Sequence, residues 1–541
     1  MRAAIEAARQ GVNVLLVDKG RLGRSSISSG DGGGSFGSIR IPTEMGGDPS
    51  VPEDAVLRDA VAGGEHLNRQ DMTELFCKEA IDRFRDLEEW GVEFGKRPDG
   101  SYDARRNMGE SYAYGFSLPT GPDAIFDSML KELRKLGVTC LSNTMVTRLL
   151  TRQGRVAGAF GLDRNWGTEL VFTAKSTVIA AGGMTGLLKH TSAYQPCSGD
   201  SFALAYEAGA QLFNMEICGF SLVPTPLGRS IPMGSTLPMT AGGARWYNAL
   251  GERIMERYDP DRLELAAEWK MPYANYNERK EGRGPVYLDL SSMKGRGPVD
   301  RVVQRIKRFA DVDPLHEMVE MSVSLRTSPG GVWINERGET TVPGLYAAGD
   351  ASGEAGTRGA GGRTGGFPNA HVFGRRAGLY AAQAAQNMGL IEAEQDQIIL
   401  EHARINGIKG SDGRSPIDVE RKLREFAFEN LNIIRNRQGL QRAIDYFQGM
   451  RQEGSRGMGA TNPGQLIKAL EVYHLAATGE MVARAGLLRT ESRGFHHRED
   501  YPERNDKEWL QWVLIRKGTN GAMDLDTRPI PTDKYPIRPG G

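Results

Sequence analysis

The sequence predicts an α/β protein organised around a parallel β-sheet. Three segments support this prediction: residues 1–18, 177–183 and 342–350. In each of them a short apolar run leads into a glycine or an acidic residue, which is typical of a buried parallel strand that ends at a ligand-facing turn. Because acids and glycines at the carboxyl ends of such strands commonly bind nucleotides, the pattern favours a Rossmann-like dinucleotide-binding domain.

The N-terminal segment has the pattern of the second half of a βαβ unit. Residues 1–11 predict a helix and residues 12–17 a buried strand, and Asp18 follows the strand. Neither a strand nor a GxGxxG loop precedes this helix, and the loop's last glycine, about 20 residues before the acid, would fall upstream of Met1. We therefore expect an N-terminally truncated sequence, whose natural form carries that strand and loop.

Changes in composition along the chain suggest its domain organisation. Helix and strand patterns predict a discontinuous nucleotide-binding domain at 1–220 and 335–390. The residues between, 221–334, are richer in proline, aromatic residues and methionine, and we expect an inserted α+β capping domain there. Residues 398–490 predict a C-terminal helical domain, and 491–541 a proline-rich tail.

Composition excludes several functional classes. The 541 residues include 68 basic and 68 acidic side chains, so the chain lacks the basic footprint of a nucleic-acid-binding protein. No apolar run is long enough to span a bilayer, and no secretory signal is visible. The four cysteines are widely spaced, so we predict no metal site. We expect a cytoplasmic protein, or one held at a membrane through a partner.

Motifs in four regions resemble those of one family. They lie at 18–20 with 24–26, at 180–183 with 197–200, at 342–350, and at 491–504. Together they resemble the flavoprotein subunits of succinate dehydrogenase and fumarate reductase, and also L-aspartate oxidase and adenylylsulfate reductase, over nearly the whole chain. The resemblance implies an FAD-dependent oxidoreductase that transfers a hydride to or from a small substrate at flavin N5.

The resemblance also implies which residues bind FAD. Ser26 stands where succinate dehydrogenases carry a histidine linked to the flavin, so we expect non-covalent FAD. The expected cofactor-binding residues are Asp18, Lys19, Ser25, Ser26, Gly32, Gly33, Val146, Ala181, Gly182, Asp200, Gly349, Asp350, Gly366 and Phe367. This assignment requires the regions of Asp18, Asp200 and Asp350 to share one crevice.

The family's dicarboxylate-binding positions differ in this sequence. Its first histidine corresponds to Val223, its threonine–glutamate pair to Thr236 and Leu237, its SRD arginine to Glu268, and its second histidine to Arg326. Valine and leucine cannot bind a carboxylate or relay a proton, and a glutamate would repel a carboxylate. We therefore expect a substrate other than succinate or fumarate.

Three basic residues are the candidate catalytic groups: Arg363, Arg326 and Lys270. The family's last arginine corresponds to Arg363 or Arg358. We favour Arg363, because it lies in a glycine-rich loop expected beside the isoalloxazine.

Two alternatives stay open at this point. One is an adenylylsulfate reductase-like flavoprotein that works with a separate iron–sulfur or ferredoxin-like subunit. The other is a non-catalytic flavin-binding subunit that has lost its site residues.

Overall fold

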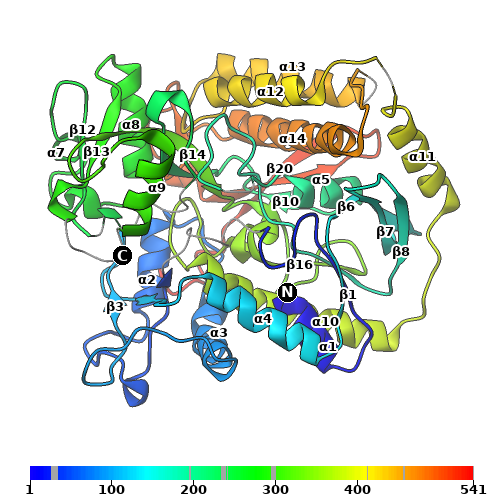
Figure 1. The fold of residues 1–541 in the computed structure, drawn as a ribbon, viewed down its shortest axis with the longest axis horizontal. Coiled ribbons are helices and arrows are strands. Elements are labelled where there is room, and N and C mark those ends of the chain that lie inside the picture. Colours follow the sequence, from blue (N-terminus) through cyan, green and yellow to red (C-terminus); the bar gives the residue numbers. More distant parts are fainter. Residues whose placement is uncertain are drawn as a thin grey trace.

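The computed structural model describes residues 1–25, 35–193, 196–232, 239–240, 242–293, 300–410, 412–454 and 457–539. Ser26, Gly32, Gly33, Thr236 and Leu237 therefore lie outside the described residues. Helices and strands alternate as an α/β fold requires, with a cofactor-binding region at the centre, a capping region at one end and stacked C-terminal helices along one side (Figure 1).

The N-terminal segment forms the predicted helix and strand. Helix α1 (Arg2–Arg9) packs on helix α10 (Gly366–Asn387), where an added Cβ at Gly378 would meet the Ala3 carbonyl oxygen at 2.2 Å. Strand β1 (Leu15–Val17) pairs in parallel with β5 (Thr139–Leu141). The expected strand before Met1 concerns residues outside this sequence and stays a prediction.

The cofactor-binding region contains a second parallel pair of strands. Strand β9 (Thr177–Ile179) pairs with β16 (Leu345–Ala347), and both strands lead into glycine-containing turns, as the sequence predicted. The other elements of this region are β2 (Ser35–Phe36), α2 (Ala55–Gly63), α3 (Gln70–Glu89), β3 (Ala104–Arg105), β4 (Gly115–Ser117), α4 (Asp123–Lys135), β6 (Thr144–Arg152), β7 (Arg155–Asp163), β8 (Glu169–Thr173) and α5 (Asp200–Glu207).

The inserted region contains both helices and strands, as expected for a capping domain. Its core is the antiparallel sheet β11-β14-β13-β12, and α8 packs on β14 and β11. The elements are β11 (Gly219–Pro224), β12 (Arg245–Tyr247), α7 (Met255–Tyr258), α8 (Lys270–Lys280), β13 (Val286–Asp289), α9 (Asp300–Ala310) and β14 (Val319–Thr327).

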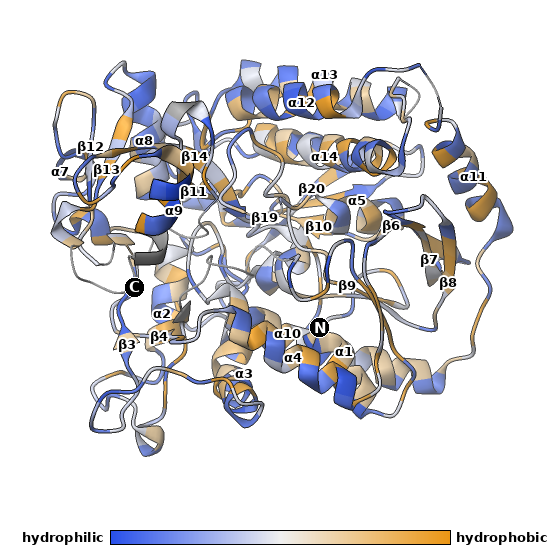
Figure 2. Cartoon of the chain, viewed as in Figure 1, coloured by the Kyte–Doolittle hydropathy of each residue, from blue (hydrophilic) through white to orange (hydrophobic). Residues whose placement is uncertain are grey.

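The C-terminal helices stack in two layers. Helix α14 (Pro463–Leu488) is largely buried and packs against α12 (Pro416–Asn430), α13 (Arg437–Glu453) and α5. In Figure 2, α12 and α13 carry many hydrophilic residues at the rim of the molecule, while α14 beneath them is paler and more hydrophobic. Helix α11 (Gln395–Asn406) lies apart from this stack, toward the β6-β7-β8 sheet.

The C-terminal residues are more than a tail. They contain β18 (His497–Arg498), α15 (Asp506–Trp509), β19 (Gln511–Lys517) and β20 (Met523–Pro529). Strands β19 and β20 form a hairpin that joins β10 (Leu212–Phe213) and β15 (Gly331–Val332) in one sheet, and β18 pairs with β17 (Ile434–Arg435). The proline content of 491–541 hid this hairpin, because its alternating pattern occupies only two short runs. The end of the chain is thereby tied to the core of the cofactor-binding region.

Candidate functional site

A cavity of about 2290 Å³ lies where the two parallel strand pairs end. Asp18, Asp200 and Asp350 all line it, so the three carboxylates share one crevice, as the sequence assignment required. Further predicted residues line the same cavity: Lys19, Ser25, Val146, Ala181, Gly182, Gly349, Gly366, Phe367, Arg326 and Arg363. The predicted site residues therefore converge from segments more than 300 residues apart in the sequence.

Asp18 sits in a turn that fixes its carboxylate. Its Oδ1 accepts hydrogen bonds from the Gly20 amide at 2.8 Å and from the Ser25 hydroxyl at 2.6 Å. These bonds orient one carboxylate oxygen from the protein side, at the carboxyl end of β1. The Ser25 hydroxyl is thus bonded to Asp18 within the same turn.

Lys19 and Asp200 form a buried ion pair at the cavity wall. The Lys19 ammonium donates to the Asp200 Oδ2 at 2.6 Å and also pairs with Glu471 at 3.0 Å. Burial alone would raise the pKa of Asp200, but Lys19 and the His474 imidazole, 2.8 Å from Oδ1, lower it well below its usual range. Asp200 therefore anchors Lys19 and helix α14 to the cavity.

Asp350 lies in a contrasting environment. It follows β16, and desolvation together with the neighbouring carboxylate of Glu354 raises the pKa of Asp350 to about 7, against the opposing effect of Arg358 and Arg326. A carboxyl group that titrates near neutrality beside a cavity is able both to accept and to donate a hydrogen bond.

The backbone of the cavity wall is shaped for close approach of a ligand. Gly182 and Gly365 have φ of 81° and 68°, which side chains rarely adopt, and an added Cβ would meet Cys197 Sγ at 2.8 Å and the Gly37 carbonyl oxygen at 2.3 Å, respectively. With acids at the ends of β1 and β16 and the N-terminus of the 22-residue helix α10 at the wall, the described residues fit an elongated flavin dinucleotide.

Glu268, Arg326, Arg358, Arg363 and Glu354 form a charge cluster at one side of the cavity, called here the cavity cluster. Glu268 is buried and accepts from Arg326 at 2.7 Å and from Arg358 at 2.9 Å. Burial opposes the ionisation of Glu268, but Arg358, Arg326 and Arg363 outweigh it and lower the pKa of Glu268. The sequence suggested that Glu268 would repel a carboxylate; in the structure its charge is paired with two arginines.

Arg363 is held differently from the other two arginines. Its Nε and Nη1 are buried and have no hydrogen-bond partner among the described residues, and the Glu110 carboxylate lies 3.8 Å from its Nε. Arg358, by contrast, uses all three nitrogens: Nε donates to the Gly362 carbonyl, Nη1 to Thr327 and Glu354, and Nη2 to Glu268. The side chain of Arg363 is 14% exposed. Arg363 also lines the cavity, so its guanidinium group is a candidate partner for an anion there.

Lys270 lies away from this cluster. It begins helix α8, and its ammonium pairs with Asp259 at 2.7 Å. It is not among the described residues that line the cavity. The geometry therefore brings Arg326 and Arg363 together but separates Lys270 from them.

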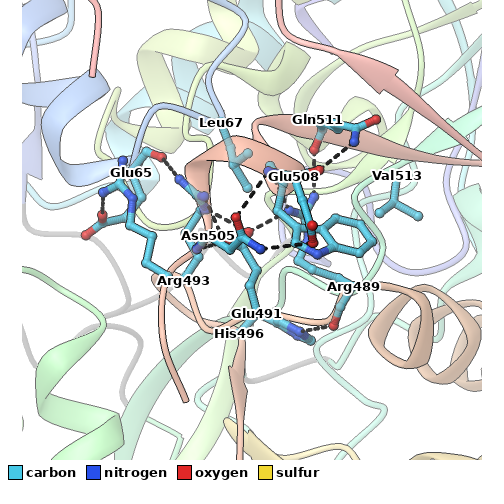
Figure 3. A network of polar contacts seen from close by, with 12 residues as sticks. Glu65, Leu67, Arg489, Glu491, Arg493, His496, Asn505, Glu508, Gln511 and Val513 are labelled. Carbon is cyan, nitrogen blue, oxygen red and sulfur yellow. Dashed lines mark hydrogen bonds and ion pairs between the residues drawn. The ribbon is translucent and has the colours of Figure 1, made fainter. Parts of the chain in front are cut away.

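A second buried charge cluster lies behind the loop that carries the cavity arginines. This C-terminal cluster comprises Glu216, Arg489, Glu491 and Arg493 (Figure 3 shows the last three). Each nitrogen of the Arg489 and Arg493 guanidinium groups has a partner, and both oxygens of Glu491 accept hydrogen bonds.

The residues that follow this cluster hold the cavity loop directly. The Phe495 amide donates to the Ala360 carbonyl at 2.9 Å, and the Ala360 amide donates to the Gly64 carbonyl at 2.9 Å. Gly494 has φ of 54°, and an added Cβ would meet the Ala360 oxygen at 2.0 Å. Ala360 lies between Arg358 and Arg363, so the C-terminal motif supports both arginines from behind.

Sequence reasoning missed Glu354. It lines the cavity, is 1% exposed, and lies in the turn between Asp350 and Arg358. The sequence contained a signal for it. Glu354 is an acidic residue within the glycine- and alanine-rich run at 349–362, and an acid cannot contribute to an apolar core. The comparison with family motifs drew attention to the arginines of this run instead.

Comparisons with known proteins agree with this geometry. A family model described as an FAD binding domain matches residues 1–365, and one described as the fumarate reductase flavoprotein C-terminus matches residues 420–540. A fumarate reductase (CoM/CoB) subunit of Methanothermobacter marburgensis is 32% identical over 95% of each chain. A fumarate reductase flavoprotein subunit of Mycobacterium tuberculosis is 26% identical, over 99% of this chain and 96% of the relative.

Solved structures share the fold. The Mycobacterium smegmatis Sdh1 structure in complex with UQ1 has a TM-score of 0.84 at 26% identity and covers 99% of this chain and 93% of its own. Escherichia coli quinol fumarate reductase has a TM-score of 0.89 at 22% identity, over 100% and 96%, a likeness of fold alone. The chain belongs to the succinate dehydrogenase and fumarate reductase flavoprotein family and is an FAD-dependent oxidoreductase.

Proposed function

We propose that this oxidoreductase transfers a hydride between FAD and a small substrate that carries one anionic group, and that succinate and fumarate are poor substrates. The observation that carries the proposal is the pairing of Glu268 with both Arg326 and Arg358. Those two guanidinium groups are hydrogen-bonded to the buried Glu268 carboxylate, whereas Arg363 lies 3.8 Å from Glu110 and keeps two nitrogens without a hydrogen-bond partner among the described residues.

The second carboxylate of a dicarboxylate would have to compete with Glu268 for Arg326 or Arg358. Removing either arginine from the carboxylate of Glu268 would leave a buried charge without its partner, at a cost of several kcal/mol. A substrate with one carboxylate avoids that cost, because it needs the guanidinium of Arg363 alone. The charge balance of the site thus favours a monoanion.

The protein's contribution to the reaction follows from the same contacts. Bound FAD supplies the hydride acceptor or donor. Arg363 holds the anionic group of the substrate and so fixes the orientation of the reacting carbon. Glu268 lies between Arg326 and Arg358 at hydrogen-bond distance from each, and we propose that it holds both guanidinium groups in place at the cavity wall.

A second candidate function is fumarate reduction. The relative at 32% identity is named a fumarate reductase, and it matches 95% of this chain. We also propose a separate electron-transfer protein as partner, since several relatives are named as subunits. Among the described residues no group of acids, histidines and cysteines could hold a metal ion, and no helix is long and apolar enough to cross a membrane.

The test compares mono- and dicarboxylates on FAD-saturated protein, with the flavin spectrum as readout. We expect propionate to perturb the spectrum at lower concentration than succinate, and fumarate to leave the reduced flavin unchanged. Glu268→Gln removes one negative charge and should tighten succinate binding by roughly 10-fold or more, since it leaves Arg326 and Arg358 without their anion. Glu320→Gln, which alters an ion pair with Arg279 in the capping region, is the matched control.

Rapid oxidation of the reduced flavin by fumarate in the wild-type protein would establish the second candidate instead. Unchanged succinate affinity in Glu268→Gln would remove the basis for the first.

A further inference from the structure

Glu354 is a buried carboxylate whose hydrogen bonding is incomplete. Its Oε1 lies 3.3 Å from Arg358 Nη1, but its Oε2 is buried and has no hydrogen-bond partner among the described residues. The residue is 1% exposed and lines the cavity. A buried carboxylate oxygen without a donor is costly, so its placement calls for a partner that arrives from the cavity.

The backbone that carries Glu354 is strained. Gly353, Glu354 and Ala355 have φ of 57°, 49° and 58°, a run of three left-handed residues of which two carry side chains. Each such non-glycine residue costs energy, and strain of this kind clusters where a side chain must be aimed at a ligand. The turn is held by Asn369, whose amide donates to the Glu354 carbonyl at 3.0 Å.

Glu354 lies within the group of charges that would surround the substrate. Arg358 contacts Glu354 directly. The negative charge of Glu354 also acts on Arg326 and on Asp350. An added Cβ at Gly366, the first residue of α10, would lie 3.9 Å from Glu354 Oε1. Glu354 and Arg363 both line the cavity, and one small molecule that pairs with both would need an anionic group and a hydrogen-bond donor.

We propose that Glu354 accepts a hydrogen bond from a donor group on the substrate, which makes the substrate class a 2-hydroxy or 2-amino monocarboxylate and its oxidised partner. This inference rests on the proposed function, because Arg363 would hold the carboxylate. It adds the second recognition element, which an unsubstituted carboxylate lacks.

The chemistry balances with Glu354 as the base. In the oxidative direction the C–H bond of the reacting carbon breaks, and its electron pair leaves with the hydrogen as a hydride. The O–H or N–H bond of the neighbouring group breaks, and its proton moves to Glu354 Oε2. The C=O or C=N bond forms from the electron pair left on oxygen or nitrogen. Reduction follows the same steps in reverse.

The test measures binding, by calorimetry on FAD-saturated protein, of three compounds with the same carbon skeleton: propionate, lactate and alanine. We expect lactate or alanine to bind roughly 10- to 100-fold more tightly than propionate, as one hydrogen bond to a charged group implies. Tighter binding of lactate identifies a hydroxyl donor, and tighter binding of alanine an ammonium donor. Glu354→Gln should reduce this preference, and most strongly for an ammonium.

Ala355→Gly is the control, because it relieves strain in the same turn without touching the carboxylate, and it should keep the wild-type preference. Equal binding of all three compounds, or a preference that survives in both Glu354→Gln and Glu354→Leu, would overturn the inference while leaving the monoanion proposal standing. If succinate binds and none of the three does, both proposals fail together.

Discussion

The cavity cluster and the C-terminal cluster are built from the same residue types but differ in how completely they are satisfied. In the C-terminal cluster each guanidinium nitrogen of Arg489 and Arg493 has a partner. In the cavity cluster Arg363 and Glu354 retain buried atoms without partners among the described residues. In the C-terminal cluster one buried atom, Glu216 Oε2, also lacks a partner, but no member of that cluster is among the described residues that line the cavity. Fully paired arginines away from the cavity indicate a role in folding, and unpaired groups on the cavity wall indicate a role in binding.

The largest expected effect on stability comes from breaking the C-terminal cluster. Glu491→Gln leaves Arg489 and Arg493, both 0% exposed, with a neutral neighbour in place of a shared carboxylate. We expect the free energy of unfolding to fall by about 3–5 kcal/mol, measured by chemical denaturation. Glu425→Gln, in an exposed pair with Arg421, should change it by less than about 0.5 kcal/mol. Equal effects in the two variants would mean that burial of the C-terminal cluster does not increase what its ion pairs contribute to the free energy of unfolding.

A smaller effect should follow from disturbing the contact between the two clusters. In Gly494→Ala the new methyl group would meet the Ala360 oxygen, and the left-handed backbone adds strain. We expect about 2–4 kcal/mol of destabilisation together with weaker propionate binding, because Ala360 lies between Arg358 and Arg363.

Gly521→Ala is the control for backbone strain alone. Gly521 also has a positive φ, of 80°, but an added Cβ there meets nothing within 4 Å, so about 1 kcal/mol is expected. If Gly494→Ala is destabilised without any change in propionate affinity, the C-terminal motif does not position the cavity loop.

The pH dependence of stability should distinguish the two cavity carboxylates. The pKa of Asp350 is raised to about 7, so its contribution to stability is complete below about pH 4 and is lost as the pH rises to about 7. The pKa of Asp200 is lowered, so its contribution is present above about pH 4 and is lost as the pH falls.

Melting temperatures of cofactor-free protein provide the measurement. Relative to wild type, Asp350→Asn should gain stability between pH 5 and pH 8, while Asp200→Asn should be destabilised throughout that range, because Lys19 loses its partner. A constant difference between Asp350→Asn and wild type across this range would contradict the raised pKa.

Much of the architecture could be predicted from the sequence, because local patterns determine it. Apolar runs and glycine turns predicted β1, β9 and β16, and residues 398–490, which contain α12 to α14, were predicted only as one helical region. The hairpin of β19 and β20 could not be predicted, since it depends on pairing with β10, some 300 residues earlier. The family motifs likewise led to the crevice shared by Asp18, Asp200 and Asp350.

The pairing of charged side chains in the site could not be predicted in the same way. The sequence identified Glu268 and Arg326 as changed positions, but only their spatial pairing reveals that they neutralise each other. From the sequence, Lys270 was a candidate cation like the two arginines. The structure pairs it with Asp259. The sequence marked Glu354 as an acid among small residues, but it could not show that one of its carboxylate oxygens lacks a partner. Ion pairing is a property of tertiary structure, and residue type alone does not encode it.

The most direct test of the contrast is the unfolding free energy of FAD-saturated Arg363→Gln, measured beside Glu491→Gln with and without saturating propionate. Without ligand, Arg363→Gln should lose less stability than Glu491→Gln, because Arg363 Nε and Nη1 have no hydrogen-bond partner and its ion pair with Glu110 is 3.8 Å long. Propionate should stabilise wild type and Glu491→Gln but not Arg363→Gln. A loss in Arg363→Gln as large as that in Glu491→Gln, or stabilisation of Arg363→Gln by propionate, would contradict the account.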